Sequence, residues 1–147
     1  SDQRPTLCAN AALDALAGHY DQEARQQGIS VEGKLELPQV LALPEADLCM
    51  ILGNLLENAL HASQKLPPEQ RQVTVMARMI TPAMLGIMVE NRYDGVLREK
   101  DGTLHSTKHE GQGIGLVSIR TVVRKYHGEL TVETENHVFR ANVLLNL

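Results

Sequence analysis

Apolar residues recur at helical spacing in three segments, with polar residues on the opposite side of each. The first segment is followed by Gly28 and the second by two prolines, which are common helix stops, and the third ends at Gly128. The second begins near Pro44, with two acidic residues in its first turn, as helix starts favour. The predicted helices span residues 9–27, 44–65 and 113–127.

Period-two alternation of apolar and polar residues predicts five strands. They span residues 31–38, 71–79, 84–91, 129–136 and 137–147, and charged residues in the first favour an edge position. Residues 92–113 lack a clear period of either kind and are rich in glycine and charge. Loops this long are uncommon inside compact domains and are usually functional, so this segment becomes a candidate for chemistry.

The order of elements argues against a doubly wound parallel sheet, because few strand pairs are separated by a single helix. One mixed sheet with helices packed on one face fits better, which makes the fold an α+β protein of the two-layer α/β sandwich type. With 147 residues, we expect a single domain that spans residues 1–147.

Composition narrows the function. A net charge of −4, without a basic run interleaved with aromatics, argues against a nucleic-acid partner. Cys8 and Cys49 do not form a CxxC pair, so we expect reduced thiols of a cytosolic protein rather than a zinc site or a disulfide framework. No apolar run approaches the roughly 18–20 residues that span a bilayer.

The second helix contains two asparagines one turn apart in an apolar run. At about 100° per residue, its core stripe comprises Leu48, Leu52, Leu55, Ala59 and Ala62, and Gly53, Glu57 and Gln64 point to water. A third stripe, about 110° from the core, comprises Asp47, Asn54, Asn58 and His61. Its amides could line a cleft, where Asn58 offers Mg²⁺ a neutral oxygen ligand, or could simply cap neighbouring backbone.

The stretch HEGQGIGL (109–116) opens the third helix with Gly111, Gly113 and Gly115. Glycine allows close approach of a ligand to the backbone, and free N–H groups at a helix start attract phosphate. The stretch is not a P-loop, since no Lys-Ser/Thr follows the last glycine, and no strand leads directly into it as a dinucleotide-binding turn requires.

Taken together, NLLENALHAS (54–63) and GQGIGL (111–116) resemble the N-box and the glycine box of the catalytic ATP-binding domain of sensor histidine kinases, within the GHKL ATPase superfamily. The closing segment, GELTVETENHVFRANVLLNL, is similar to the terminal hairpin of these domains, so the resemblance spans nearly the whole chain. HEGQGIGL, VENRYDG and the first helix look like the branch that contains peptide-quorum-sensing kinases. The resemblance implies a mixed, mostly antiparallel sheet with about three helices on one face.

The resemblance also implies ATP and Mg²⁺ as cofactors and assigns roles to residues. Asn58 matches the Mg²⁺ ligand, Asn54 matches the upper amide near the phosphates, and both would be catalytic. His61 falls where many relatives carry a Lys or Arg that faces phosphate. The nucleotide would be bordered by Gly111, Gly113, Gly115 and Leu116, and by an ATP lid (residues 92–110) with Lys108 as a phosphate contact.

The adenine contact departs from the family pattern. Most relatives carry Asp-x-Gly-x-Gly after the second central strand, and its Asp accepts a hydrogen bond from the adenine amino group. Here Asn91 stands at that position, and its side-chain oxygen can still accept, although without charge assistance. Asp94 is the alternative, but we favour Asn91 because it directly follows the apolar strand. Asn91 could also merely end the strand.

These roles predict phosphoryl transfer by positioning and charge neutralisation. The phosphoacceptor histidine is expected on a separate upstream segment, with a response regulator downstream, in a full-length protein that is dimeric and membrane-anchored and keeps this domain in the cytoplasm. A GHKL ATPase is disfavoured, because Asn54 stands where those enzymes have a glutamate base. An anti-sigma-type serine kinase and a degenerate nucleotide-binding module remain alternatives.

Overall fold

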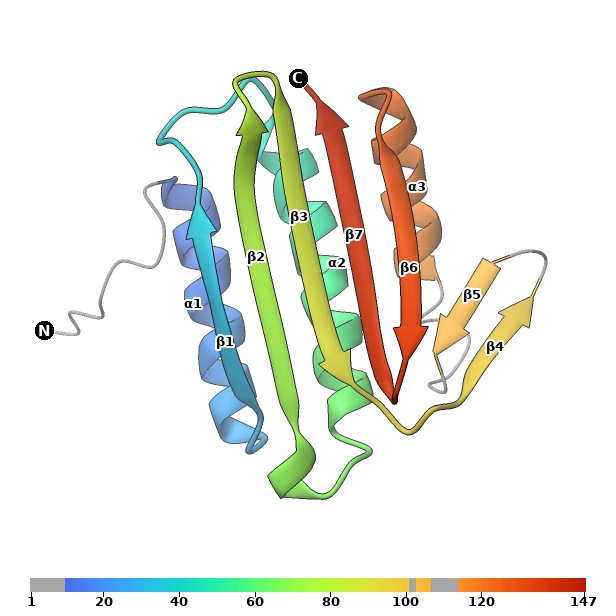
Figure 1. The fold of residues 1–147 in the computed structure, drawn as a ribbon. Helices are drawn as coiled ribbons and strands as arrows, with labels where there is room; N and C mark the ends of the chain where they lie inside the picture. The colour runs from blue at the N-terminus through green and yellow to red at the C-terminus, as the bar shows by residue number, and fades with distance from the viewer. Residues whose placement is uncertain (1–9, 101–102, 107–113) are drawn as a thin grey trace, which may run out of the picture.

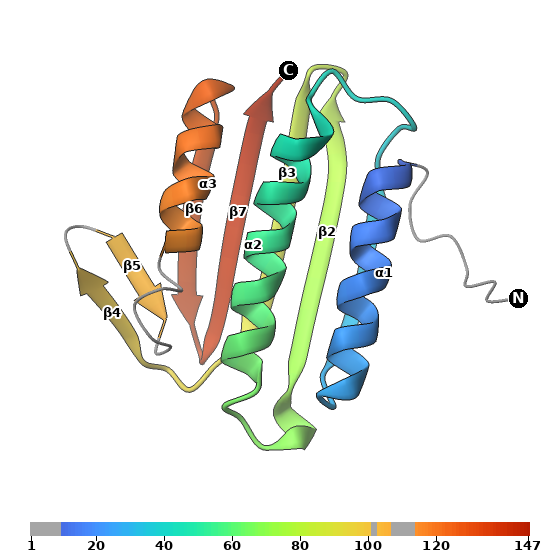
Figure 2. The ribbon, with the colours of Figure 1, turned by 180° about the vertical axis from the view of Figure 1, so that it is seen from behind.

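The computed structural model describes residues 10–100, 103–106 and 114–147. In this part of the chain, a five-stranded sheet forms one layer and three α-helices form the second, all on the same face (Figures 1 and 2). The helices are α1 (Ala11–Gln26), α2 (Glu45–Ser63) and α3 (Ile114–Lys125), and a 3-10 turn, η1 (Pro68–Gln70), precedes the second strand. The predicted two-layer sandwich is therefore confirmed.

The sheet has the strand order β1-β2-β3-β7-β6. Its strands are β1 (Ser30–Glu36), β2 (Gln72–Thr81), β3 (Met84–Arg92), β6 (Glu129–Glu135) and β7 (Val138–Asn146). β1 pairs with β2 in parallel, and the other neighbours are antiparallel, so the sheet is mixed and mostly antiparallel as expected. In β2, β3 and β7 the buried residues alternate with more exposed ones over most of each strand, which places the core between the two layers.

The central helix is α2, which lies between α1 and α3 (Figure 2). The prediction that Gly53 points to water is wrong, because α1 covers that side and Gly53 is buried beneath Tyr20 and Leu16. Glu57 and Gln64 are exposed but bind α1 and its C-cap: the Tyr20 hydroxyl donates to Glu57 at 2.9 Å, and Gln64 donates to Gln27, which caps the helix. A residue without a side chain lets a second helix pack here.

The prediction of a loop over residues 92–113 is only partly right. β4 (Leu97–Lys100) and β5 (Thr103–Ser106) pair antiparallel and lie beside the α3 side of the sheet (Figures 1 and 2). An Asp-Gly dipeptide lies between these two strands in the sequence, but the residues on either side do not alternate between apolar and polar as a hairpin signal requires. Separately, no helix among the described residues is long and apolar enough to cross a bilayer.

Candidate functional site

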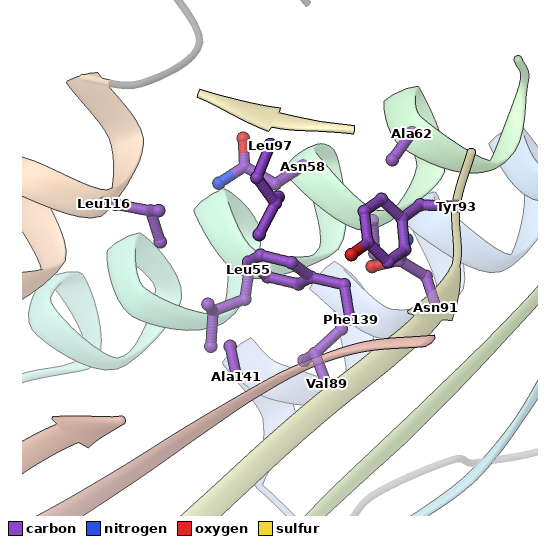
Figure 3. A pocket seen from close by; sticks show the side chains of 11 residues that line it. Leu55, Asn58, Ala62, Val89, Asn91, Tyr93, Leu97, Leu116, Phe139 and Ala141 are labelled. Carbon is purple, nitrogen blue, oxygen red and sulfur yellow. The ribbon is translucent and has the colours of Figure 1, made fainter. Parts of the chain in front are cut away.

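A pocket lies between α2, the sheet and the start of α3 (Figure 3). It is lined by Leu55, Asn58, Ala59 and Ala62 of α2, Val89 and Asn91 of β3, Tyr93 and Leu97, Leu116 of α3, and Phe139 and Ala141 of β7. Because most of these side chains are apolar, the few polar groups among them decide what a ligand can bond.

Two carboxamides enter the pocket from different elements (Figure 3). Asn58 lies at the edge of the buried side of α2 and is half-buried. Asn91 is the last inward-facing residue of β3, after the buried Leu85, Ile87 and Val89, and only 4% of it is exposed. The helix period and the strand period thus bring the two predicted amides to one cavity, although 33 positions separate them in the sequence.

The Asn91 amide has a defined orientation. Its Nδ2 donates to the backbone oxygen of Arg92 at 2.9 Å, so the carbonyl end is left for the pocket (Figure 3). Asp94, the alternative adenine contact, is exposed and does not line the pocket. Its carboxylate accepts from the Val96 backbone N–H at 2.9 Å. The structure therefore places Asn91, and not Asp94, where a pocket ligand can reach it.

Aromatic rings border the pocket, and sequence reasoning missed them. Tyr93 is 8% exposed and meets Phe139 edge to face, with ring centroids 6.1 Å apart. Its backbone N–H also donates to the carbonyl of His137, which ties the segment after β3 to the turn that precedes β7. The signal was the scarcity of aromatics: the chain has three tyrosines, one phenylalanine and no tryptophan, and two of these four rings lie here.

The other predicted site residues fall into three groups. Leu116 lines the pocket and is 6% exposed, and Gly115 precedes it in the first turn of α3. Asn54 and His61 are half-buried on α2. They lie within four positions of Asn58 in the sequence, but neither lines the pocket. The remaining three, Lys108, Gly111 and Gly113, lie outside the described residues.

The polar groups of the pocket suit a metal ion that binds together with a nucleotide, but not one that is held by protein side chains alone. Within the described ranges, no group of three or more His, Cys, Asp and Glu side chains could hold a metal ion. Mg²⁺ usually needs only one or two protein oxygens, because water and substrate phosphates complete its shell. The carboxamide oxygen of Asn58 is a ligand of that kind, so the residues present fit Mg²⁺ bound to a nucleotide.

Comparison with known proteins identifies relatives by sequence. A family profile described as GHKL domain matches residues 43–146. The two-component sensor PhoQ of Pseudomonas aeruginosa is 28% identical over 127 residues, covering 82% of this chain and 27% of PhoQ. Sensor protein TdiS of Thauera aromatica is 27% identical over 99 residues, covering 64% of this chain and 18% of TdiS. The chain thus spans less than a third of each curated relative.

Solved structures share the fold. The mycobacterial sensor histidine kinase MprB matches with a TM-score of 0.69 and 21% identity, over 92% of this chain and 93% of that one. The nucleotide-free catalytic domain of histidine kinase ThkA matches with a TM-score of 0.72 and 14% identity, over 93% and 90%. The blue-light-activated histidine kinase of Erythrobacter litoralis matches with a TM-score of 0.72 and 18% identity, over 95% and 42%. These domains have the same two-layer arrangement.

Proposed function

Because the chain belongs to the GHKL domain family, we propose that it is the ATP-binding catalytic domain of a sensor histidine kinase. It would supply Mg-ATP for phosphorylation of a histidine on a separate segment of the full-length protein. Its relatives by sequence and by fold are sensor histidine kinases. The observation that carries the proposal is the shared pocket of Asn58, Asn91 and Leu116, which unites the two motif regions and the strand end.

Adenine occupies the apolar part of the pocket in this proposal. Its exocyclic amino group donates to Oδ1 of Asn91, while Tyr93 and Phe139 border the ring. Since Asn91 is 4% exposed, this hydrogen bond forms away from water, where an unsatisfied acceptor is costly. A 6-oxo purine presents an acceptor at the same place, so guanine nucleotides bind more weakly.

The start of α3 and the polar stripe of α2 would hold the phosphates and Mg²⁺. Asn58 would provide an oxygen to the metal, and Asn54 and His61, on the same helix, would face the phosphates. The start of α3, with Gly115 and Leu116, supplies backbone N–H groups and a partial positive charge to the phosphates. Lys108, Gly111 and Gly113 complete the phosphate site in this proposal.

The chain's own residues bind and orient the nucleotide, and the metal supplies charge neutralisation at the phosphates. Asn54 is neutral and cannot take a proton from water, so the domain holds ATP with little hydrolysis. The attacking imidazole comes from the separate segment. We further propose that residues 1–147 form one domain, on the cytoplasmic side of a dimeric, membrane-anchored sensor that passes its phosphoryl group to a response regulator.

Calorimetric titration of the purified chain tests this function. We expect saturable binding of ATP that strengthens with Mg²⁺, and weaker binding of GTP. Asn58→Ala should remove most of the Mg²⁺ effect, while Asn142→Ala, on the uncovered face of the sheet, serves as a matched control. No detectable heat with millimolar Mg-ATP would favour a degenerate module.

A hydrolysis assay separates the kinase domain from a GHKL ATPase. The wild-type chain should release little phosphate from ATP, and Asn54→Glu should increase the release by placing a carboxylate base at that position. Sustained turnover by the unmodified chain would contradict the proposal and favour the ATPase.

A further inference from the structure

Helices α2 and α3 run antiparallel beside each other (Figure 2). Side-chain contacts connect them at the end that is remote from the pocket. Asp47 lies in the first turn of α2, whereas Lys125 ends α3 and Tyr126 follows it. These three residues, the Asp47 cluster, are close in space although 78 and 79 positions separate the partners in sequence. At the other end of the two helices, Asn58 and Leu116 line the pocket.

The Asp47 cluster is held by short, directed contacts. The Tyr126 hydroxyl donates to Oδ2 of Asp47 at 2.5 Å, and the Lys125 ammonium donates to the same oxygen at 3.1 Å. The ammonium also lies 5.4 Å from the centre of the Tyr126 ring. An acid in the first turn of one helix and a base in the last turn of the other each complement the dipole of their own helix.

The backbone around Tyr126 is fixed as well. Its carbonyl accepts from the Asn146 N–H of β7 at 3.1 Å, and the next carbonyl, of His127, accepts from the Asn146 side chain at 2.5 Å. The end of α3 is therefore tied both to the sheet and to the start of α2. From Lys125 back to Leu116 the helix covers about 13 Å, at 1.5 Å per residue.

The helix period links the Asp47 cluster to the pocket. Asp47 and Asn58 are 11 positions apart, which at about 100° per residue leaves them only about 20° apart around the axis of α2. Both therefore lie on one side of α2, the side along which α3 runs. A stiff helix that is held at one end and packed along its length transmits a displacement to its other end, because packed interfaces do not deform continuously.

We propose that Asp47 is a positioning residue for the pocket: by holding Tyr126 and Lys125 it sets where α3 lies along α2, and hence where Leu116 stands relative to Asn58. The inference rests on the proposed function only for its ligand. The ion pair itself adds little to stability, because the side chain of Lys125 is 60% exposed and exposed ion pairs contribute little. The main effect of this pair is therefore on geometry.

The test combines a structural readout with a binding readout in the intact chain. Asp47→Ala and Tyr126→Phe should each shift the methyl NMR signals of Leu116 in the absence of nucleotide. Each should also weaken Mg-ATP binding about fivefold or more, the usual lower range for coupled sites. The double variant should lose no more than the single ones, because both remove the same connection. Asp47→Asn keeps an acceptor for the Tyr126 hydroxyl and should recover part of the affinity.

Glu45→Ala is the control, because Glu45 is an exposed acid in the same helical turn as Asp47. It should leave the Leu116 signals and the affinity unchanged. Unmoved Leu116 signals in Asp47→Ala and Tyr126→Phe would overturn the inference, whether or not affinity falls, since any loss would then not pass through α3. Absence of ATP binding by the wild-type chain would instead refute the proposed function, and the methyl signals would still decide the role of Asp47.

Discussion

Replacing Asn91 by Asp tests which end of this side chain faces the pocket. The two side chains have nearly the same shape, but the substitution exchanges the Nδ2 donor for an oxygen. In the structure that donor is 2.9 Å from the backbone oxygen of Arg92, and Asn91 is 4% exposed. A carboxylate in this orientation would place one of its oxygens against the backbone oxygen of Arg92, so that two hydrogen-bond acceptors would face each other away from water.

The expected loss of stability follows from these two facts. The hydrogen bond to Arg92 contributes about 0.5–1.5 kcal/mol, and leaving a buried acceptor unsatisfied costs about 1–3 kcal/mol more. We therefore expect Asn91→Asp to lower the free energy of unfolding by about 1.5–4.5 kcal/mol at pH 7. For a chain of this length, each kcal/mol corresponds to about 2–4 °C in Tm.

The loss should depend on pH in a definite direction. Burial disfavours the charged form, so the pKa of an introduced carboxyl should be raised above its unfolded value of about 3.9. Stability is then lost as pH rises through the unfolded value and up to the folded one. Below about pH 4 the neutral carboxyl can donate its O–H to the Arg92 oxygen, and most of the loss should disappear.

Urea denaturation at pH 7 and at acidic pH measures both effects. Asn136→Asp is the control, because it adds the same charge at an exposed turn and should stay within about 0.5 kcal/mol of the wild type. If Asn91→Asp at pH 7 were as stable as this control, the amide would have the opposite orientation. A donor would then face the pocket, and the assignment of Asn91 as the acceptor for the adenine amino group would fail.

Three further predictions concern the helices and the roles of the two amides. Gly53→Ala should stabilise the chain by about 0.5–1 kcal/mol in urea denaturation, because a new Cβ makes only ordinary contacts with α1; a loss would mean that α1 packs closer. The hydrogen bond to Asp47 raises the pKa of Tyr126, so the stability that this bond provides is present below about pH 10 and lost as pH rises through the raised value. The stability of Asp47→Ala, measured by urea denaturation at alkaline pH, should lack this loss. If the variant had the same pH profile as the wild type, the prediction would be wrong. In calorimetry, Asn58→Asp should alter Mg²⁺ dependence more than adenine affinity, and Asn91→Ala the reverse, whereas equal effects would undo the role assignment.

The fold could be predicted from the sequence because its elements have clear periods. α2 and the strands that face it carry apolar residues at the helical or strand spacing, and the prolines and glycines between them mark the ends. β4 and β5 could not be recognised in the same way. LREK and TLHS (residues 97–100 and 103–106) each contain one apolar residue, so neither gives an alternating pattern.

The candidate site could be predicted in part, for different reasons at each residue. Asn91 was predicted because the resemblance places it where the family has an Asp, directly after an apolar strand, and the structure places it in the pocket together with Asn58. Tyr93 and Phe139 were missed because the first lies in a segment without a period and the second belongs to the last strand. Only the pairing of β3 with β7 brings the two rings together. Phe139 is the cross-strand partner of Asn91, and Tyr93 follows Asn91 by two positions.

The polar stripe of α2 illustrates what a helical period determines and what it leaves open. The period places Asp47 and Asn58 on one side, but it does not say what covers that side. α2 has 19 residues and α3 has 12, so α3 is about 18 Å long against about 28 Å for α2. Because α3 ends beside Asp47 and runs back along α2, its described start lies near the level of Asn58, about 16 Å from Asp47. Asp47 therefore contacts the end of α3, whereas Asn58 lies near its start and lines the pocket, so the length of α3 helps to determine which residue of the stripe can meet a ligand.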